Sequence, residues 1–479
     1  MSYIIGLDVG TTSVRSCVYD VNDGSFQMVK QKEVDQIYPK PDWVEEEAED
    51  IFLSTRMCLN EAYDKVDGDV IGISLTNMRE TVLCWDSVTR KPLYNAIIWQ
   101  CRRTKDFCES MSAQTKRLIY DKTGLVVDAY FSASKIKYLI DNVPKVREAL
   151  EAGRLRVGTV DSYIIYRLTK GENFVTDVTN ACRTMLYNIH TMSYDDELLK
   201  IFGIPREILP EVLDNDKVFG FADFGGNRVP IAGVIGDQQS ALFGQDCLEK
   251  GSAKVTYGTG LFMLFNTGDK ICHTDKGLIS TVAYKVDGKV TYALEGSVFN
   301  AGTAIKFLRD NLGMITSAAE TETLARSVTS TNGVCFVPAF TGLGAPHWKS
   351  EARGLIYGLT RGSEKAHVVR AALEAMAYAA RELFDIMQQA SGIDLDFVKA
   401  DGGASENKFL MQFQADQLQV PVKVPLNKEA TVLGSVKMCL KALGLAYKGG
   451  GELLSFLPET RDDETYELWL DAVKRCLID

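Results

Sequence analysis

The chain has 479 residues, of which 46% are hydrophobic and 24% charged, and its formal net charge is −11. This length exceeds what one hydrophobic core organises, so we expect a globular protein of two or three domains. The acidic balance argues against a nucleic-acid partner, and the lack of a long apolar run or of an apolar leader argues against a membrane span.

The chain opens with a strand, a tight polar turn and a second strand, over YIIGLDVGTTSVRSCVYD (Tyr3 to Asp20). AKVTYGTGLFMLFNTG (Ala253 to Gly268) has the same plan. Glycine permits unusual turn geometry and close approach of a ligand, and threonine hydroxyls add donors that suit phosphate oxygens. One such hairpin is usually only a turn. Two of them, opening the two halves of the chain, predict two related domains that grip one phosphate chain.

Between the hairpins, several short segments alternate between strand and helix patterns. A helix is expected from about Val44, and the apolar run from Val70 to Leu75 predicts a buried strand that ends in the polar cluster TNMRET. Arg79 and Glu80 belong to this cluster. Charged neighbours after a strand are usually a solvated loop, so these two residues alone do not define a site.

Asp237 lies between two apolar stretches, VPIAGVIG and SALFGQ. Buried carboxylates are uncommon unless they are paired or functional. We therefore expect Asp237 to be partly buried or to lie at the floor of a cleft. The domain boundary is expected just after it, near Gly244 to Gly251.

The second half alternates strands and helices again. Gly302 marks a strand-to-helix entry, Ala366 to Met387 is the clearest long helix, and EATVLGSVKMCLKALG predicts another helix with Gly434 at its start. ADGGASEN predicts a strand, a glycine turn and a helix, and alone it could be a simple connection. Such alternation predicts sheets covered by helices in both domains.

The eleven cysteines are scattered from Cys17 to Cys476 without a CxxC pair. This pattern is typical of reduced, mostly buried thiols in a cytosolic protein, so we expect a cytoplasmic location. The four histidines are far apart in the sequence, which argues against zinc. There is no GxxxxGK[ST] motif and no HRD or DFG, so neither a P-loop nor a protein kinase is expected.

Nearly the whole chain nevertheless resembles the FGGY family of carbohydrate kinases. The segments that carry the resemblance, in order, are GLDVGTTSVR, YPKPDWVE, TNMRETVLCWD, NAIIWQCRRT, KTGLVVDAYFSASK, GTVDSYIIYRLT, DVTNACRTML, AGVIGDQQSALFGQ, TYGTG, ALEGSVFNAG, VPAFTGLGAPHW, RGLIYGLTRG and DGGASENKFLMQFQAD. The resemblance implies an α/β protein of two domains, 1–246 and 247–479, with the actin/hexokinase/Hsp70-like ATPase fold and a central cleft. The first domain would hold the polyol site and the first phosphate hairpin, and the second would hold the other hairpin and the nucleoside site.

The resemblance also implies an activity, which is ATP-dependent phosphorylation of glycerol to sn-glycerol 3-phosphate with Mg²⁺. Asp237 is the implied base and Asp8 the implied Mg²⁺ ligand, through water. The other implied contacts are Arg79, Glu80, Tyr130 and Gln238 with the polyol hydroxyls, Trp99 and Phe262 over its carbon chain, Thr11, Thr12, Ser13, Arg15 and Thr259 with the phosphates, and Gly302, Lys306, Gly403 and Asn407 at the nucleoside.

The chain departs from the family pattern at Met78 and Lys306, where Gln is usual, and at Ala129, where Pro is usual. Two alternatives stay open: a kinase of the same family that acts on another polyol or a sugar, and a non-catalytic ATP-binding scaffold of the same fold. Retention of Asp8, Asp237 and both hairpins speaks against the scaffold. We also expect a homo-oligomer, a dimer or tetramer.

Overall fold

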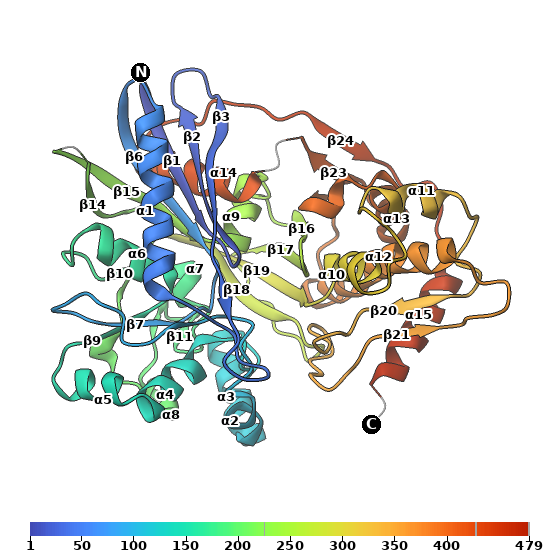
Figure 1. The fold of residues 1–479 in the computed structure, drawn as a ribbon, viewed down its shortest axis with the longest axis horizontal. Helices are drawn as coiled ribbons and strands as arrows, with labels where there is room; N and C mark the ends of the chain where they lie inside the picture. Colours follow the sequence, from blue (N-terminus) through green and yellow to red (C-terminus); the bar gives the residue numbers. More distant parts are fainter. Residues whose placement is uncertain (225, 427–428, 478–479) are drawn as a thin grey trace. The chain divides into compact units, whose positions relative to one another are not determined.

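A computed structural model describes residues 1–224, 226–426 and 429–477. The chain folds into two compact units (Figure 1). The first unit contains Met1–Asp246, Ser280–Tyr292 and Glu429–Gly450, and the second contains Cys247–Ile279, Ala293–Lys428 and Gly451–Asp479. The chain therefore changes unit after Asp246, and two later segments return to the first unit.

The first unit is built on a six-stranded sheet in the order β14-β15-β6-β1-β2-β3. Its strands are β1 (Ser2–Val9), β2 (Ser13–Asp20), β3 (Phe26–Glu33), β6 (Asp69–Asn77), β14 (Val218–Phe224) and β15 (Asn227–Gly236). Strand β1 is buried on both faces, as its nearly continuous apolar sequence predicts. Ile5, Leu7 and Val9 join the core under α1 (Ala48–Lys65), while Ile4 packs with residues of α14 (Ala430–Ala442).

Three strands of this sheet end at the same edge. β1 runs parallel to β6 with Asp8 opposite Thr76, and β15 runs parallel to β6 with Gly236 opposite Asn77. In an open α/β sheet, ligands bind just outside the carboxyl ends of the strands. Asp8, Arg79 and Asp237 all lie at or just beyond this edge, because each is within two residues of the end of its strand.

Helix α14 packs closely on α9 (Asp237–Gly244), and glycine makes this approach possible. A Cβ atom on Gly434 would lie 1.8 Å from the Ser240 carbonyl oxygen, and one on Gly244 would lie 2.0 Å from that of Ala430. The prediction that Gly434 begins a helix is therefore wrong. It lies inside α14, where the missing side chain lets α14 approach α9 closely.

The rest of the first unit consists of short elements around this sheet. They are β4 (Gln36–Ile37), β5 (Glu45–Glu46), β7 (Leu83–Asp86), β8 (Ala96–Ile97), α2 (Lys105–Ser110), α3 (Ala113–Thr123), α4 (Ser132–Asn142), α5 (Pro144–Glu151), β9 (Leu155–Gly158), α6 (Val160–Leu168), β10 (Val175–Asp177), α7 (Val178–Ala181), β11 (Tyr187–Asn188), β12 (Ser193–Tyr194), α8 (Asp196–Phe202), the 3₁₀ turn Arg206–Ile208 and β13 (Glu211–Leu213).

The second unit contains most of a seven-stranded sheet in the order β18-β19-β17-β16-β22-β23-β24. Nearly all of β18 (Ile279–Val286) and the start of β19 (Lys289–Val298) belong to the segment Ser280–Tyr292 of the first unit. The elements of the second unit are β16 (Ala253–Tyr257), β17 (Leu261–Gly268), the rest of β19, α10 (Gly302–Lys306), the π-turn Phe307–Asn311, α11 (Glu320–Arg326), β20 (Cys335–Val337), β21 (Leu355–Tyr357), α12 (Lys365–Ser391), β22 (Val398–Asp401), the 3₁₀ turn Gly403–Glu406, α13 (Lys408–Leu418), β23 (Val422–Pro425), β24 (Leu453–Phe456) and α15 (Asp463–Cys476).

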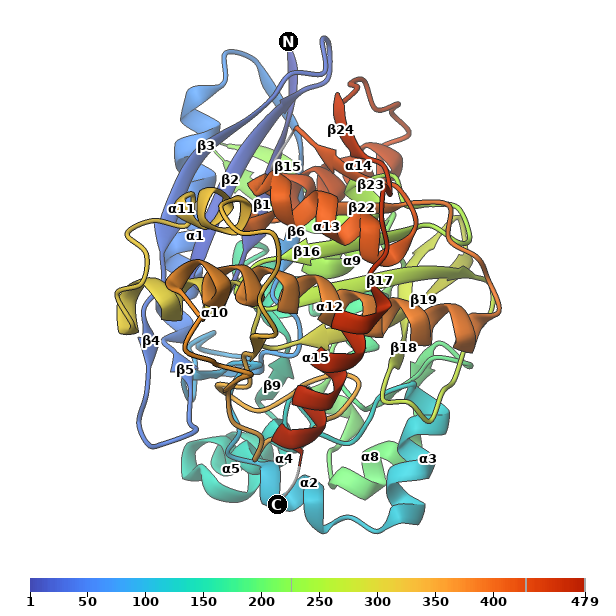
Figure 2. The same ribbon diagram turned by 90° about the vertical axis from the view of Figure 1, so that its right-hand side faces the viewer.

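The long helix α12 forms the centre of the second unit's core, and α13 and α15 pack against it (Figure 2). It begins with a reciprocal capping box, in which Glu364 and His367 each bond the other's backbone N–H. It ends at Gly392, which takes the left-handed conformation with φ 66°. The long helix expected from Ala366 is thus confirmed.

All eleven cysteines lie in the described ranges, and none forms a disulfide. Every one except Cys476 is buried. This confirms the expectation of free, mostly buried thiols. No helix in the described part of the chain is long and apolar enough to cross a membrane.

Candidate active site

The centre of the candidate site is the ion pair between Arg79, which follows β6, and Asp237, the first residue of α9. Arg79 Nε lies 3.2 Å from Asp237 Oδ1, and the same nitrogen lies 3.8 Å from Glu80 Oε1. The Arg79 side chain is 1% exposed, whereas that of Asp237 is 27% exposed. The guanidinium is therefore fixed in the interior, and the carboxylate reaches solvent with a positive charge beside it.

Local sequence explains how these two groups meet. Gly236 precedes Asp237, and a Cβ atom there would lie 2.8 Å from Arg79 Cγ. Only glycine leaves room for the arginine stem against the end of β15. Arg79 also donates from Nη1 to Gln239 Oε1 at 3.1 Å, which ties it to the first turn of α9. Gln238, between them, donates its backbone N–H to Asp237 Oδ1 at 2.6 Å.

Trp99 and Tyr130 form an aromatic corner. Their rings meet edge to face with centroids 5.7 Å apart. The Trp99 indole N–H donates to Thr11 Oγ1 at 2.9 Å. Trp99, which was expected to lie over the carbon chain of the polyol, therefore contacts the turn of the first hairpin directly. The Tyr130 backbone N–H donates to Asp128, whose carboxylate is held by Arg102.

Asp8 on β1 and Arg15 on β2 lie opposite each other, close to the turn of the first hairpin. Arg15 Nη1 lies 3.5 Å from Glu429 Oε2. Burial raises the pKa of the Asp8 carboxyl to about 7, and Asp237 and Glu429 add to the rise while Arg15 opposes it. Clustered carboxylates of this kind favour a bound cation, since a positive charge removes their mutual repulsion.

Thr12 and Ser13 complete this turn. The Thr12 carbonyl accepts from the Val34 N–H, and the Ser13 carbonyl accepts from the Gly10 N–H at 3.0 Å. The Thr12 side chain is exposed, whereas Ser13 is only 7% exposed. Thr12 is accordingly the better placed of the two hydroxyls to reach a ligand.

Beneath this edge lies a buried polar network that the sequence reasoning missed. The Asp177 carboxylate accepts from the Asn180 amide at 2.7 Å and from the Thr179 N–H at 2.6 Å. Thr179 Oγ1 accepts from the Gly236 N–H at 2.8 Å, and Asn180 exchanges two 3.0 Å hydrogen bonds with Asn77. Asp177 thus links the ends of β6 and β15. The polar run DVTN was the available signal.

Met78 belongs to the hydrophobic core of the first unit and is 1% exposed. Its backbone N–H donates to the Val9 carbonyl at 2.9 Å. Its side chain packs with core residues under the sheet. Ala129 is likewise buried, with 0% exposure.

In the second unit, the turn of the second hairpin, the start of α10 and the turn after β22 lie close together. The N–H groups of Ala301 and Gly302 donate to the carbonyls of Thr259 and Gly258 at 3.0 and 3.1 Å. β16 runs parallel to β22 with Thr256 opposite Asp401, so Gly402 follows beside the hairpin turn. Gly403 comes next, and a Cβ atom on it would meet nothing within 4 Å.

The remaining predicted residues of this unit have different surroundings. Phe262 is half-buried on β17 opposite Thr256, and Lys306 is exposed at the end of α10. The Asn407 side chain caps α13 by accepting from the Leu410 N–H at 3.0 Å, and it donates to Thr321 Oγ1 at 3.1 Å. Asn407 therefore has a structural role in this unit.

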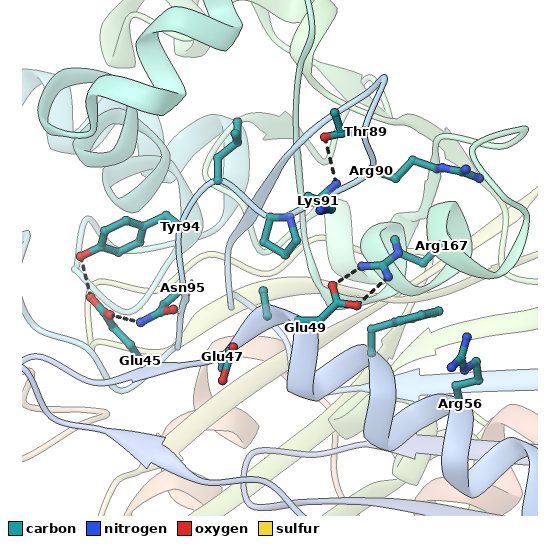
Figure 3. Close-up of a pocket in the computed structure, with 14 residues that line it drawn as sticks. Glu45, Glu47, Glu49, Arg56, Thr89, Arg90, Lys91, Tyr94, Asn95 and Arg167 are labelled. Atoms are coloured by element: carbon teal, nitrogen blue, oxygen red, sulfur yellow. Dashed lines mark hydrogen bonds and ion pairs between the residues drawn. The ribbon is translucent and has the colours of Figure 1, made fainter.

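A separate cavity of about 900 Å³ lies in the first unit between the start of α1 and the β7–β8 connection (Figure 3). None of the predicted site residues lines it. At one end Glu45 accepts from Tyr94 and Asn95, and at the other end Arg167 holds Glu49 with two hydrogen bonds of 2.7 and 2.8 Å. The charges that line it largely compensate one another.

Among the described residues, no group of three or more His, Cys, Asp or Glu side chains is arranged to hold a metal ion. The candidate site thus offers a divalent cation few direct protein ligands. Mg²⁺ commonly binds in this way, through one or two carboxylates, retained waters and substrate phosphates.

Two α/β units, with a hairpin turn of Gly and Thr in each, define a phosphotransferase of the sugar-kinase class. The N-terminal domain model of the FGGY family of carbohydrate kinases matches residues 3–244, and the C-terminal domain model matches residues 253–443. The chain belongs to the FGGY family of carbohydrate kinases. Its α/β, two-domain, actin/hexokinase-like fold is confirmed by these matches and by the solved structures described next.

Curated relatives match over almost the whole chain. A glycerol kinase of Deinococcus radiodurans is 49% identical over 99% of this chain and 97% of its own length. A glycerol kinase of Shewanella pealeana is 48% identical over 99% of both chains. The crystal structure of Plasmodium falciparum glycerol kinase with ADP is 37% identical, with a TM-score of 0.87, and covers 100% of this chain and 99% of that one. A ligand-bound xylulose kinase from Lactobacillus acidophilus, 22% identical with a TM-score of 0.84 over 100% of this chain and 97% of its own, shares the fold.

Proposed function

We propose that this chain catalyses the ATP-dependent phosphorylation of glycerol to sn-glycerol 3-phosphate, with release of ADP. The observation that carries the proposal is the Arg79–Asp237 ion pair at the shared edge of β1, β6 and β15. The near full-length identity of 47–49% to relatives named glycerol kinase supports it, because a three-carbon polyol is their substrate by name.

Asp237 acts as the base in this proposal. Its carboxylate lies 3.2 Å from the Arg79 guanidinium, whose positive charge compensates it. Its partial exposure lets it accept a hydrogen bond from the terminal hydroxyl of glycerol and so orient the oxygen toward the transferred phosphoryl group. The proton then passes to Asp237 as the new P–O bond forms.

The other hydroxyls of glycerol are assigned to Arg79, Glu80, Tyr130 and Gln238. Buried hydrogen-bonding groups reject molecules that leave them unpaired, which makes this set selective for a small polyol. Trp99 covers the carbon chain, and its edge-to-face contact with Tyr130 fixes the width of that end of the site. Phe262 is assigned to the same carbon chain.

ATP is the proposed phosphoryl donor. Thr11, Thr12, Ser13, Arg15 and Thr259 are assigned to its phosphates, and Gly302, Lys306, Gly403 and Asn407 to its nucleoside. The turn glycines support this assignment, since backbone without side chains lets phosphates and a flat base approach closely. Asn407 could serve there through its backbone, because its side chain already caps α13.

Asp8 is assigned to Mg²⁺, held through water. The cation supplies charge neutralisation on the phosphates and on the developing transition state. The residues present fit this role, because burial and the nearby carboxylates of Asp237 and Glu429 raise the pKa of Asp8, and a cation there would relieve that repulsion. We further propose a cytoplasmic location and assembly as a dimer or tetramer.

Two alternatives remain testable. A kinase of the same family that acts on a longer polyol or a sugar would share the fold and the base. A non-catalytic ATP-binding protein would keep the nucleotide turns without turnover. Initial rates of ADP release at fixed MgATP, measured with glycerol, longer polyols, xylulose and gluconate, separate the three. We expect glycerol to give the highest kcat/KM. A higher value for any other acceptor, or no turnover with every acceptor, contradicts the proposal.

A further inference from the structure

Glu80 has an unusual backbone that the proposed chemistry does not by itself explain. Its φ is 60°, in the left-handed region that a side chain with a Cβ atom disfavours. This conformation turns its carbonyl inward, where it accepts from Ser132 Oγ at 3.1 Å and from Lys135 Nζ at 3.2 Å. Both donors lie in the first turn of α4. The backbone of Glu80 is therefore held by side chains from a different element.

Lys135 also donates to the Tyr130 carbonyl at 2.6 Å. One ammonium group thus bridges the backbones of Glu80 and Tyr130, which are fifty residues apart in sequence and are both assigned to the polyol. The Lys135 side chain is completely buried, with 0% exposure. Burial lowers the pKa of the Lys135 amine to about 8, and the Glu80 charge opposes that effect.

Arg183 acts on the same two residues through their side chains. Its Nε lies 2.6 Å from Glu80 Oε1, and its guanidinium carbon lies 6.0 Å from the centre of the Tyr130 ring. The Arg183 side chain is 0% exposed. Glu80 and Tyr130 are thus held twice, by a buried lysine at the backbone and by a buried arginine at the side chain.

We propose that Lys135 is a positioning residue for polyol binding, which sets the separation between Glu80 and Tyr130 by bridging their carbonyls. This inference rests on the proposed function, since it assigns both residues to the polyol. Lys135 does not itself touch the substrate, because its three-donor head is directed to backbone carbonyls in the interior.

A purely structural role explains this lysine poorly. A buried ammonium loses its hydration, and neutral hydroxyl or amide donors would satisfy two backbone carbonyls without that loss. Methionine has a similar length and would fill the space. A lysine at this place is explained if the carbonyls of Glu80 and Tyr130 must be held at a fixed separation. Small displacements of substrate-binding groups reduce turnover strongly.

The test is Lys135→Met, with steady-state kinetics for glycerol and for MgATP and with thermal unfolding. We expect the KM for glycerol to rise roughly tenfold to a hundredfold, with a smaller change in kcat and none in the KM for MgATP. We expect the melting temperature to fall modestly, because two buried carbonyls lose a donor. The matched control is Lys137→Met in the same helix, whose lysine pairs with Asp141 and is 31% exposed, and it should leave all four values unchanged.

A second variant keeps the proposal testable if Lys135→Met does not fold. Ser132→Ala removes the other donor to the Glu80 carbonyl and should raise the KM for glycerol alone, by a smaller factor. An unchanged KM for glycerol in both variants overturns the proposal. So does a general effect in which kcat falls and the KM values for glycerol and MgATP both rise in proportion to the loss of stability. Wild-type protein that never phosphorylates glycerol would instead overturn the proposed function, so the two failures are distinguishable.

Discussion

Arg79 Nε lies 3.2 Å from Asp237 Oδ1, and this ion pair joins the second residue beyond β6 to the first residue of α9. The arginine is almost fully buried, and its positive charge is compensated by the acidic neighbours Asp237 and Glu80. The same pair leaves the Asp237 carboxylate 27% exposed, so it still reaches solvent. One contact therefore serves both the fold and the proposed chemistry.

The variant Arg79→Met tests this double role. We expect weaker glycerol binding, because a charged donor is lost, and a stability decrease of about 3–5 kcal/mol, because a buried ion pair loses one partner. Kinetics and urea unfolding of the same preparation measure both effects. Arg206→Met is the control: its pair with Asp196 is at the surface, with side chains 53% and 90% exposed, and should contribute little. Unchanged stability in Arg79→Met would show that the ion pair is not structural.

The indole of Trp99 gives a second prediction, because it bonds Thr11 of the first hairpin. Trp99→Phe and Thr11→Val each remove this 2.9 Å hydrogen bond. In a double-mutant cycle on kcat/KM for glycerol, we expect a coupling of about 1 kcal/mol. Trp43→Phe, whose ring packs on Tyr138, replaces Trp99→Phe in the control cycle and should be additive with Thr11→Val. Additivity of the Trp99 cycle would show that the hairpin turn and the aromatic corner act independently.

The edge on which the site is built could be predicted from the sequence, and its supporting contacts could not. The apolar strand Val70 to Leu75 and the polar cluster after it indicated where Arg79 would lie, and the structure has β6 at Asp69–Asn77. No local pattern indicated that Gly236 leaves room for Arg79, because that contact joins residues far apart in sequence. For the same reason, Lys135 and Arg183 read as ordinary helix and loop residues.

At Gly434, a local sequence pattern led to a wrong prediction. A glycine near an expected helix terminus is often a boundary, but its place inside α14 is set by the Ser240 carbonyl of another helix. Asn407 is a similar case, since its cap on α13 follows a common local rule, whereas its assignment to the nucleoside came from family resemblance. Both residues show that contacts with other segments could be found only in the structure.

A buried carboxylate pair gives a prediction for pH. Asp161 is fully buried and accepts from Thr159 and Thr176 at 2.6 Å, and burial together with nearby Asp177 raises its pKa. A raised pKa in the folded state means that its stabilising contribution is full below about pH 4 and is lost as the pH rises toward the folded value. Asp161→Asn removes this dependence, and its amide accepts from one threonine hydroxyl and can donate to the other.

The melting temperature of wild-type protein should therefore fall relative to Asp161→Asn between pH 4 and 8. At pH 8 we expect the variant to be more stable by about 1–3 kcal/mol. Scanning fluorimetry at several pH values measures the difference. Asp223→Asn, at an exposed pair with Lys170, serves as the control. Parallel curves for wild type and Asp161→Asn would show that Asp161 does not change its protonation in this range.

Variants of two adjacent glycines, Gly402 and Gly403, test stability and nucleotide binding separately in the second unit. Gly402 has φ 85°, and a Cβ atom on it would lie 2.4 Å from the Tyr257 carbonyl oxygen, so Gly402→Ala should destabilise the protein by about 1–3 kcal/mol. Gly403→Ala meets no neighbour and should fold normally. If Gly403 lies against the nucleoside, as proposed, Gly403→Ala raises the KM for MgATP without changing the melting temperature. A normal KM for MgATP would remove Gly403 from the assignment.

The most direct test of the central claim is the variant Asp237→Asn, measured for both turnover and nucleotide affinity. Removal of the base should lower kcat for glycerol by about 10²–10⁴-fold. The dissociation constant for MgATP, from titration calorimetry, should stay close to that of wild type. Turnover that persists near the wild-type rate in Asp237→Asn would contradict the account.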